Sequence, residues 1–233
     1  MSRFVFIIFI VISLGACSPV IKTNQDLCLS DPHLLNQCGQ PFVKEPWRFV
    51  HKIEASLPMG KHVTMIGVTR IDPGQITLQG VLMTIEGFVL FDGLWQKGRL
   101  AVLRAIPPFD RPAFAENMIN DMCLLFLTPR MASLTHVMQK EGDLVCRYRQ
   151  SEDISIDMII HEDQSWSIKV FSGHLLKEIQ ATSIGNNVPQ FMELKGHAYT
   201  LKLTTIMAEP DSGGNMEDIN TESCLKTGGE SEI

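Results

Sequence analysis

The sequence has little of what catalytic proteins usually display. Its seven histidines are scattered, and no two of them have the His-x-x-x-His spacing that places two imidazoles on one helical face. There is no Gly-x-Ser-x-Gly nucleophile elbow, and the glycines fall at turns and form no phosphate loop or dinucleotide fingerprint. These absences predict a protein that is not an enzyme and that uses no metal and no cofactor.

Positive charge is also scarce. The chain has 20 Lys and Arg against 26 Asp and Glu, a formal net charge of −6. From Glu209 onward there are seven acidic residues and one basic residue, Lys226, so most of the excess negative charge lies at the end of the chain. Because the nearly neutral body offers no basic surface to phosphates, nucleic-acid binding is disfavoured. Residues 208–233, rich in Gly, Ser and acids, predict an acidic disordered tail.

An apolar run long enough to cross a bilayer is missing as well. The run at 4–14 follows Arg3 and has eleven residues, short of the ~20 that a spanning helix needs. It ends in Leu14-Gly15-Ala16-Cys17 and is typical of a secretory signal. This ending resembles the lipobox of bacterial lipoproteins. The resemblance implies a signal peptide at 1–16, acylation of Cys17 and stable membrane attachment. In such lipoproteins the residue after the acylated cysteine directs sorting between the two membranes. Because Ser18 is not an aspartate, the resemblance implies the periplasmic face of the outer membrane.

Five further cysteines remain to be placed. Export to an oxidising compartment favours a local disulfide between Cys28 and Cys38, with two free thiols as the alternative. Cys123 falls in a helical pattern and Cys146 in a strand pattern, so each is either a small buried apolar residue or one half of a pair. The spacing leaves that choice open. Cys224 lies in the acidic tail without an evident partner.

Alternating apolar and polar residues predict a mainly β domain at 47–207, after a lipidated tether at 17–46. We expect about eleven strands, at 49–57, 62–71, 75–85, 88–95, 99–106, 144–150, 154–160, 166–172, 175–182, 190–194 and 197–207. Between the two sets, the pattern predicts a helix at 111–128 and a second short helix at 132–140. So many strands predict strong curvature.

Flexible apolar side chains are abundant, with twelve Met and twelve Phe but only two Tyr. A curved sheet under a single helix favours a cavity for a hydrophobic ligand, because Met adapts to irregular apolar shapes. The candidate lining residues are Met83, Phe114, Met118, Met122, Phe126, Met158 and Met192. An ordinary Met-rich solid core is the alternative.

The order of lipobox, tether, five strands, helical block and six strands resembles the outer-membrane lipoprotein receptor family of LolB and its LolA-type periplasmic carrier relatives. More narrowly, GFVLFDG at 87–93 and GRLAVL at 98–103 are similar to a family of bacterial lipoproteins of unknown function. The resemblance implies a strongly curved, incompletely closed antiparallel β-barrel with helices across its opening and an acyl-binding cavity between them. LolB also has a protruding loop with an exposed leucine. Leu94 and Trp95 are the nearest candidates here, although strand-end core positions explain them as well.

These observations predict a membrane-anchored envelope lipoprotein that binds a lipid or a lipidated protein. It would assist the transfer or localisation of that ligand at the outer membrane, with apolar burial as the driving force. The alternative is a structural or interaction module of an envelope complex with a solid β core. A hydrolase finds no support in the motifs. A connected apolar cavity under the helix at 111–128 would favour the carrier, whereas a solid core would count against it and leave the interaction module.

Overall fold

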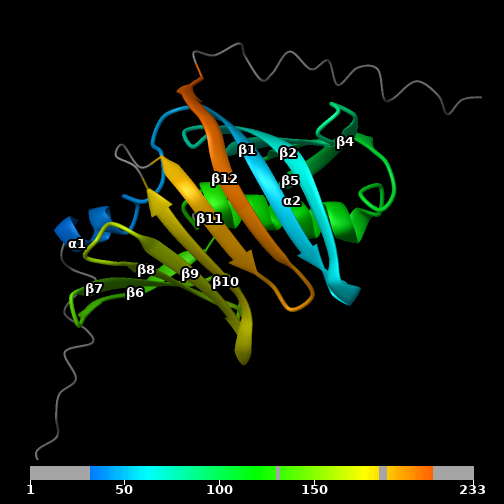
Figure 1. Cartoon of the computed structure of the whole chain (residues 1–233). Coiled ribbons are helices and arrows are strands. Elements are labelled where there is room, and N and C mark those ends of the chain that lie inside the picture. The colour runs from blue at the N-terminus through cyan, green and yellow to red at the C-terminus, as the bar shows by residue number, and fades with distance from the viewer. Residues whose placement is uncertain (1–31, 130–131, 184–187, 212–233) are drawn as a thin grey trace, which may run out of the picture.

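The chain folds into one antiparallel sheet of twelve strands with two α-helices in the part that the structure describes (Figure 1). This computed structural model describes residues 32–129, 132–183 and 188–211. The strands are β1 (Trp47–Leu57), β2 (Lys61–Asp72), β3 (Thr77–Met83), β4 (Val89–Gln96), β5 (Arg99–Ala105), β6 (Ser133–Lys140), β7 (Asp143–Arg149), β8 (Ser155–Ile160), β9 (Trp166–Ser172), β10 (His174–Ser183), β11 (Pro189–Lys195) and β12 (Thr200–Pro210). The helices are α1 (Pro32–Gln37) and α2 (Pro112–Phe126), with a 3₁₀ turn at Pro58–Gly60.

Two meanders build this sheet. Strands β1 to β5 and strands β6 to β12 each pair with the next strand along the chain, and the pairing of β1 with β12 joins the two sets. Strands β5 and β6 remain as the edges, so the barrel is not closed. The sheet curves, and α2, which connects the two edge strands in sequence, crosses its concave face (Figure 1). The predicted curved, incompletely closed antiparallel barrel is therefore confirmed.

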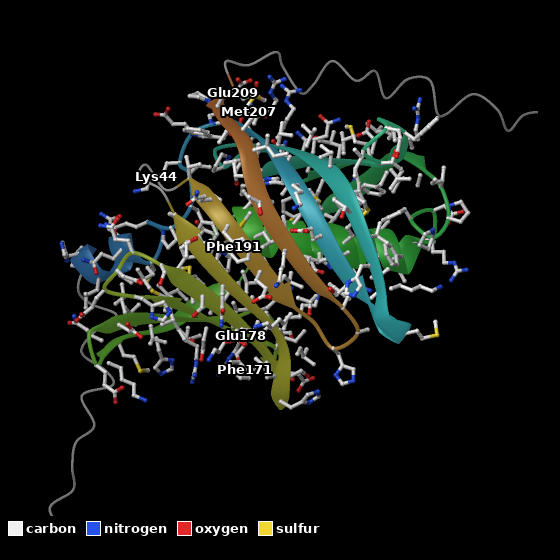
Figure 2. The ribbon with its side chains drawn as sticks, in the orientation of Figure 1. Lys44, Phe171, Glu178, Phe191, Met207 and Glu209 are labelled. Atoms are coloured by element: carbon white, nitrogen blue, oxygen red, sulfur yellow. A yellow bond between two sulfur atoms is a disulfide. The ribbon has the colours of Figure 1, made fainter. Side chains whose placement is uncertain are left out.

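Alternation along each strand separates a buried concave face from an exposed convex one. In β1, Phe49 and His51 are buried on the concave face, whereas Arg48 is exposed on the other. Phe191 and Met207 lie on the convex side, away from α2 (Figure 2). The core thus lies on the concave face, covered by α2 and by the segment at 38–43.

Residues 133–140 form strand β6, so the predicted short helix at 132–140 is wrong. Val137 is buried and pairs with Cys146 of β7. A window of eight residues is too short for periodicity to separate a helix from a strand. The β-branched Thr135 and Val137 favour a strand here, and β7 supplies the partner for its backbone hydrogen bonds.

Cys38 forms a disulfide with Cys146, and their Cα atoms are 5.9 Å apart. The predicted pairing of Cys28 with Cys38 is therefore wrong, and Cys28 itself lies outside the described residues. Cys123 is a free thiol, so it does not pair with Cys146, and burial raises the pKa of Cys123 to about 12. The disulfide joins the segment before β1 to a strand 108 residues away, a contact that local spacing does not reveal.

Part of the predicted tether belongs to the fold. After α1, Cys38, Phe42 and Val43 are buried, and the ring of Phe42 lies 5.4 Å from that of Trp166 on β9. The predicted signal peptide at 1–16, Cys17, and residues 212–233 of the predicted tail lie outside the described residues. Among the residues described, no helix has the length and apolar character needed to cross a membrane.

Candidate functional site

Helix α2 covers the concave face, and we call the interface between them the α2 seam. Ala115, Ile119, Leu125 and Phe126 of α2 are buried there. The ring of Phe126 lies 5.5 Å from Phe49 and 5.1 Å from His51, both on β1. The helix begins at Pro112, which suits a first turn because its missing N–H has no partner to lose, and it ends before Thr128-Pro129, as expected.

The face of α2 that packs on the sheet differs slightly from the predicted one. The sequence places Phe114, Met118, Met122 and Phe126 on the buried face, but Phe114 is 43% exposed and the two methionines are only partly buried. Ala115 and Ile119 lie deepest near the start of the helix. The small side chain of Ala115 allows the helix to approach the sheet closely. The larger side chains of Met118 and Met122 therefore lie to the sides of this contact.

Glycine on the sheet makes room for Met122. A Cβ atom at Gly80 on β3 would lie 2.4 Å from Cε of Met122, so the thioether end rests directly on the β3 backbone. Gly93 of β4 pairs directly with Gly80. The concave face therefore carries no side chains at these two positions, and the flexible side chain of Met122 fills the space above Gly80.

The other predicted lining residues separate into two groups. Met158 on β8 and Met192 on β11 are fully buried on the concave face of the second meander. Met83 pairs with Ile66 and points to the convex side, since Leu82 beside it faces α2. The structure thus places Met118, Met122, Phe126, Met158 and Met192 on the core side and leaves Met83 and Phe114 out of it.

The described core is closely filled at the end of α2. A cavity of about 10 Å³ lies between Phe42, Phe49, Phe126 and Trp166, with Pro41, Val43, Ile71, Leu125 and Pro189 completing its walls. That volume is about what one water molecule requires. This cavity cannot hold an acyl chain, so a lipid could enter the seam only if α2 moved away from the sheet.

A buried polar cluster lies in the middle of the seam. Asp121 of α2 is 3% exposed, and its carboxylate accepts hydrogen bonds from the Lys177 ammonium on β10 and from the Tyr199 hydroxyl in the turn before β12. Burial raises the pKa of Tyr199, and the Asp121 carboxylate raises it further, so the phenol stays protonated and acts as a donor. We call these three residues the Asp121 cluster; they link the helix to the second meander.

His51 is a second buried polar group under α2. Its ring stacks on Phe49 at 5.7 Å, and its Nδ1 lies 3.3 Å from Oγ1 of Thr205 on β12. Burial lowers the pKa of His51 to about 4, so the ring is neutral at neutral pH. Its Nε2 atom has no hydrogen-bond partner among the described residues.

Several exposed apolar side chains lie at the same end of the sheet, which we call the apolar end. Met59 is 88% exposed in the turn between β1 and β2, and Ile85 and Phe88 are 66% and 72% exposed in the turn between β3 and β4. Alternate turns of a meander lie at the same end of the sheet. The amide of Ile106 donates a hydrogen bond to the carbonyl of Leu90, which places the exposed Ile106 beside the turn between β3 and β4. The chain continues from Ile106 into α2.

The opposite end of the sheet is polar, with Asp72, Lys97, Glu141 and Asp163 at its turns. The described chain enters and leaves there, because Trp47 at the start of β1 pairs with Pro210 at the end of β12. Leu94 and Trp95, the nearest candidates for an exposed loop group, instead occupy core and strand positions, as the alternative predicted. Trp95 is a core residue and Leu94 is partly buried within β4.

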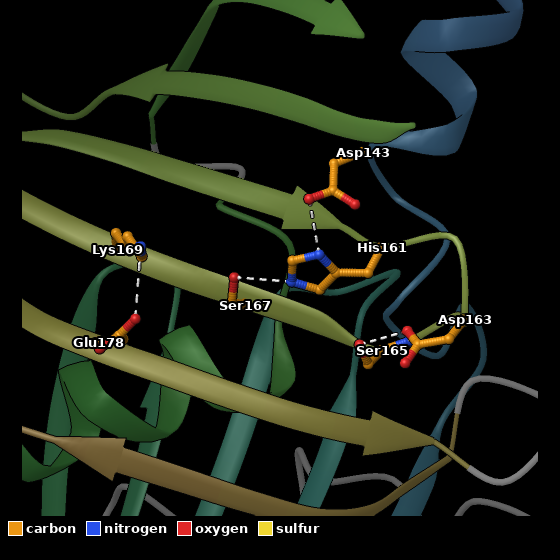
Figure 3. A network of polar contacts seen from close by, with 7 residues as sticks. All are labelled: Asp143, His161, Asp163, Ser165, Ser167, Lys169 and Glu178. Carbon is orange, nitrogen blue, oxygen red and sulfur yellow. Dashed lines mark hydrogen bonds and ion pairs between the residues drawn. The ribbon is translucent and has the colours of Figure 1, made fainter. Parts of the chain in front are cut away.

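A polar network on the convex face contains an Asp, a His and a Ser in the order in which hydrolase triads connect them (Figure 3). The His161 ring has Nδ1 2.9 Å from Asp143 Oδ2 and Nε2 3.4 Å from Ser167 Oγ. Ser167 is only 6% exposed within β9, so its hydroxyl is not presented to a substrate. Nearby, Asp163 accepts hydrogen bonds from Ser165, and Lys169 pairs with Glu178. The contacts of His161 and Asp163 hold the turn after β8, and the pair of Lys169 and Glu178 joins β9 to β10. None of these contacts supports a hydrolase.

Sequence reasoning missed the Asp121 cluster. A signal was present, because Asp121 is the one charged residue in the apolar stretch that runs from Met118 to Leu127. Likewise Lys177 occupies the same face of β10 as the buried Ile179 and Ala181. Neither residue identifies the other in the sequence, since 56 residues separate them.

No protein-family model and no curated protein matches this chain. Among solved structures it is similar to a LolA superfamily protein of Nitrosomonas europaea, with a TM-score of 0.52 and 8% identity over 78% of this chain and 94% of that one. An outer membrane lipoprotein-sorting protein domain of Vibrio parahaemolyticus has a TM-score of 0.48 and 9% identity, covering 82% and 96%. A DUF1329 family protein of Desulfovibrio piger has 0.47 and 9%, covering 78% and 92%.

The fold resemblance inferred from the order of elements is therefore confirmed. At 8% identity the first of these likenesses establishes the fold and nothing beyond it.

Proposed function

We propose that this protein is an envelope lipoprotein, anchored through acylated Cys17 at the periplasmic face of the outer membrane, that binds the acyl chain of a lipid or lipidated protein in the α2 seam. Its action would be non-enzymatic, with the ligand held by apolar burial at roughly 25 cal/mol per Å². Helix α2 acts as a displaceable cover. The ligand enters and leaves at the apolar end.

The observation that carries this proposal is the position of the apolar end next to the start of α2. Phe114, in the first turn of the helix, is exposed and its ring lies 5.3 Å from that of Phe109. Ile106 precedes this pair and adjoins the turn that holds Ile85 and Phe88. A cluster of exposed apolar groups is typical of a binding surface. Here Ile106, Ile85, Phe88 and Phe114 lie beside the start of α2, where the seam would open if the helix moved.

The residues of the seam suit reversible opening. Met122 rests on the glycine backbone of β3 through a flexible thioether, and a long, unbranched side chain can repack around an acyl chain. Met118, partly buried beside it, offers the same adaptability. When α2 moves, an acyl chain would take over the concave surface that the helix leaves.

The second candidate function is an interaction module of an envelope complex. The observation that favours it is the filled state of the seam, where the cavity beside Phe126 measures about 10 Å³. In that case α2 would be a permanent part of the core and the convex face would contact the partner.

Native mass spectrometry of the full chain, purified from membranes and transferred to amphipol, separates the two candidates. We expect acyl groups on Cys17 in the intact mass and a co-purified lipid on the wild-type protein. Met122→Lys places a charge in the seam and should abolish lipid retention, because an unpaired charge in an apolar site is strongly disfavoured.

The matched control is Met207→Lys, on the convex face of β12, which should leave retention unchanged. Both variants must keep the wild-type circular dichroism spectrum. Equal retention by the two variants would place the site elsewhere, and the absence of lipid from the wild type would leave the interaction module.

A further inference from the structure

We propose that Lys177 and Tyr199 form a subsite for the anionic head group of the amphiphile that occupies the α2 seam. The inference rests on the proposed function and narrows its ligand to a molecule with a carboxylate or phosphate next to its acyl chain. In the described structure the carboxylate of Asp121 occupies this subsite.

Lys177 is a cation on the core side of the sheet. It pairs across strands with Val170, and Ile179 two residues later is fully buried on the same face. The Lys177 side chain is only one-quarter exposed. A lysine in such a position keeps its charge at a cost unless an anion lies against it.

The anion that lies against it comes from α2, the element that the proposed function displaces. Asp121 belongs to α2, whereas Lys177 and Tyr199 belong to the sheet and its turn. The displacement of α2 that admits an acyl chain therefore also removes the carboxylate from the cation and the phenol. Both donors would then face the opened seam without a partner.

Tyr199 is positioned to remain with the sheet. The Gly196 amide donates to the Tyr199 carbonyl, and a Cβ at Gly196 would lie 3.4 Å from the Tyr199 ring. The backbone of Tyr199 is thus held by its own turn and stays with the sheet when α2 moves. A fixed phenol O–H and an ammonium directed at one point match the oxygen atoms of a carboxylate or phosphate.

An anionic amphiphile can therefore replace both functions of α2 at once. Its acyl chain covers the apolar surface, and its head group takes the place of the Asp121 carboxylate. A neutral amphiphile of the same length covers the apolar surface but leaves Lys177 and Tyr199 unpartnered. This difference predicts selectivity for the anionic ligand, by about tenfold or more, as is usual for a charged hydrogen bond.

The test uses the full chain in amphipol at pH 8 with three photoreactive probes of equal length. They are a diazirine-bearing hexadecanoic acid, its methyl ester and the corresponding hexadecyl phosphate. Dose-dependent crosslinking is measured by intact mass. We expect the wild type to prefer the acid or the phosphate over the ester by about tenfold or more, and comparison of the two anions identifies the head group.

Two variants and one control locate the effect. Asp121→Asn removes the competing carboxylate and should strengthen binding of the anionic probes. Asp121→Asn combined with Lys177→Met removes both charges without leaving one unpaired, and should abolish the preference while ester binding persists. Lys202→Met changes an exposed lysine on the convex side of β12 and should behave as the wild type.

The outcomes separate the two proposals. Equal binding of acid, phosphate and ester by the wild type, or a preference that survives the double variant, would refute the anionic subsite and leave the acyl-binding function standing. Failure of all three probes to bind would overturn the function itself. Thermal denaturation of each variant shows whether the fold is intact.

Discussion

His51 shows how a single residue can couple the stability of this core to pH. It is enclosed between Phe49 and Phe126, under α2, and burial lowers its pKa to about 4 from the usual 6.5. The folded protein therefore binds this proton more weakly than the unfolded chain does. Between these two pKa values the unfolded state holds more protons, so the free energy of unfolding decreases as the pH falls.

We expect His51 to cost about 3 kcal/mol of stability as the pH falls from 6.5 to 4, with no further contribution outside that window. His51→Phe keeps an aromatic ring in place and should remove this part of the pH dependence. Urea unfolding at pH 7.5, 5.5 and 4.5 measures it. The exposed His174, changed to Gln, serves as control and should retain the wild-type slope. An unchanged slope in His51→Phe would contradict the assignment.

At the scale of elements, two paired glycines of the first meander differ in their surroundings, because Gly80 lies against α2 and Gly93 lies against side chains of β4 and β5. A Cβ at Gly80 meets the flexible end of Met122, which can move aside. A Cβ at Gly93 would lie 2.5 Å from the ring of Phe91, a fully buried side chain that has no space to move. Substitution of each glycine by alanine should therefore change the free energy of unfolding by different amounts.

We predict that Gly93→Ala lowers the free energy of unfolding by about 1–3 kcal/mol through overpacking. Gly80→Ala should change it by less than about 1 kcal/mol, because the thioether shifts and the alanine restricts the unfolded chain. Urea denaturation compares them, with Gly39→Ala as a control that meets only an ordinary contact. A larger loss for Gly80→Ala than for Gly93→Ala would show that Met122 is held rigidly and would weaken the proposal of a displaceable α2.

At the scale of the whole molecule, three links join the two meanders. The pairing of β1 with β12 continues the sheet, α2 crosses the concave face, and the disulfide attaches the segment before β1 to β7. Of these links α2 alone rests on side-chain packing and the Asp121 cluster. A domain braced by a sheet and a covalent bond can release its helix without coming apart, which is what the proposed function requires.

The disulfide closes a loop of 108 residues, so its removal should lower the free energy of unfolding substantially. We expect Cys38→Ser with Cys146→Ser to lower the free energy of unfolding by about 4–5 kcal/mol, on the loop-entropy scale. Urea unfolding with and without dithiothreitol measures this. The reductant should destabilise the wild type and leave the double variant unchanged. Cys123→Ala, which changes the free thiol, should respond to the reductant as the wild type does. A wild type insensitive to the reductant would contradict the bond.

Most of the fold could be predicted from sequence because its elements carry local signals. Strands such as β8 and β9 alternate clearly, and the helix has four-residue apolar spacing with prolines near both ends. Strand β6 could not be recognised, since its short apolar pattern fits a helix equally well. Within the candidate site, Met118, Met122 and Phe126 were placed correctly on α2. Met83 was not, because one position along a strand reverses the face.

The sequence by itself determined the class of the fold, the position of the main helix, the excess of flexible apolar side chains and the lipobox-like ending at Cys17. These properties are local, because each depends on residues within one turn, one strand or one short motif. Only the tertiary structure decided that Cys38 meets Cys146, that Asp121 meets Lys177 and Tyr199, and that the exposed apolar side chains share one end of the sheet. Such contacts join residues that are distant along the chain, and the pairing of strands, not the spacing of residues, brings them together.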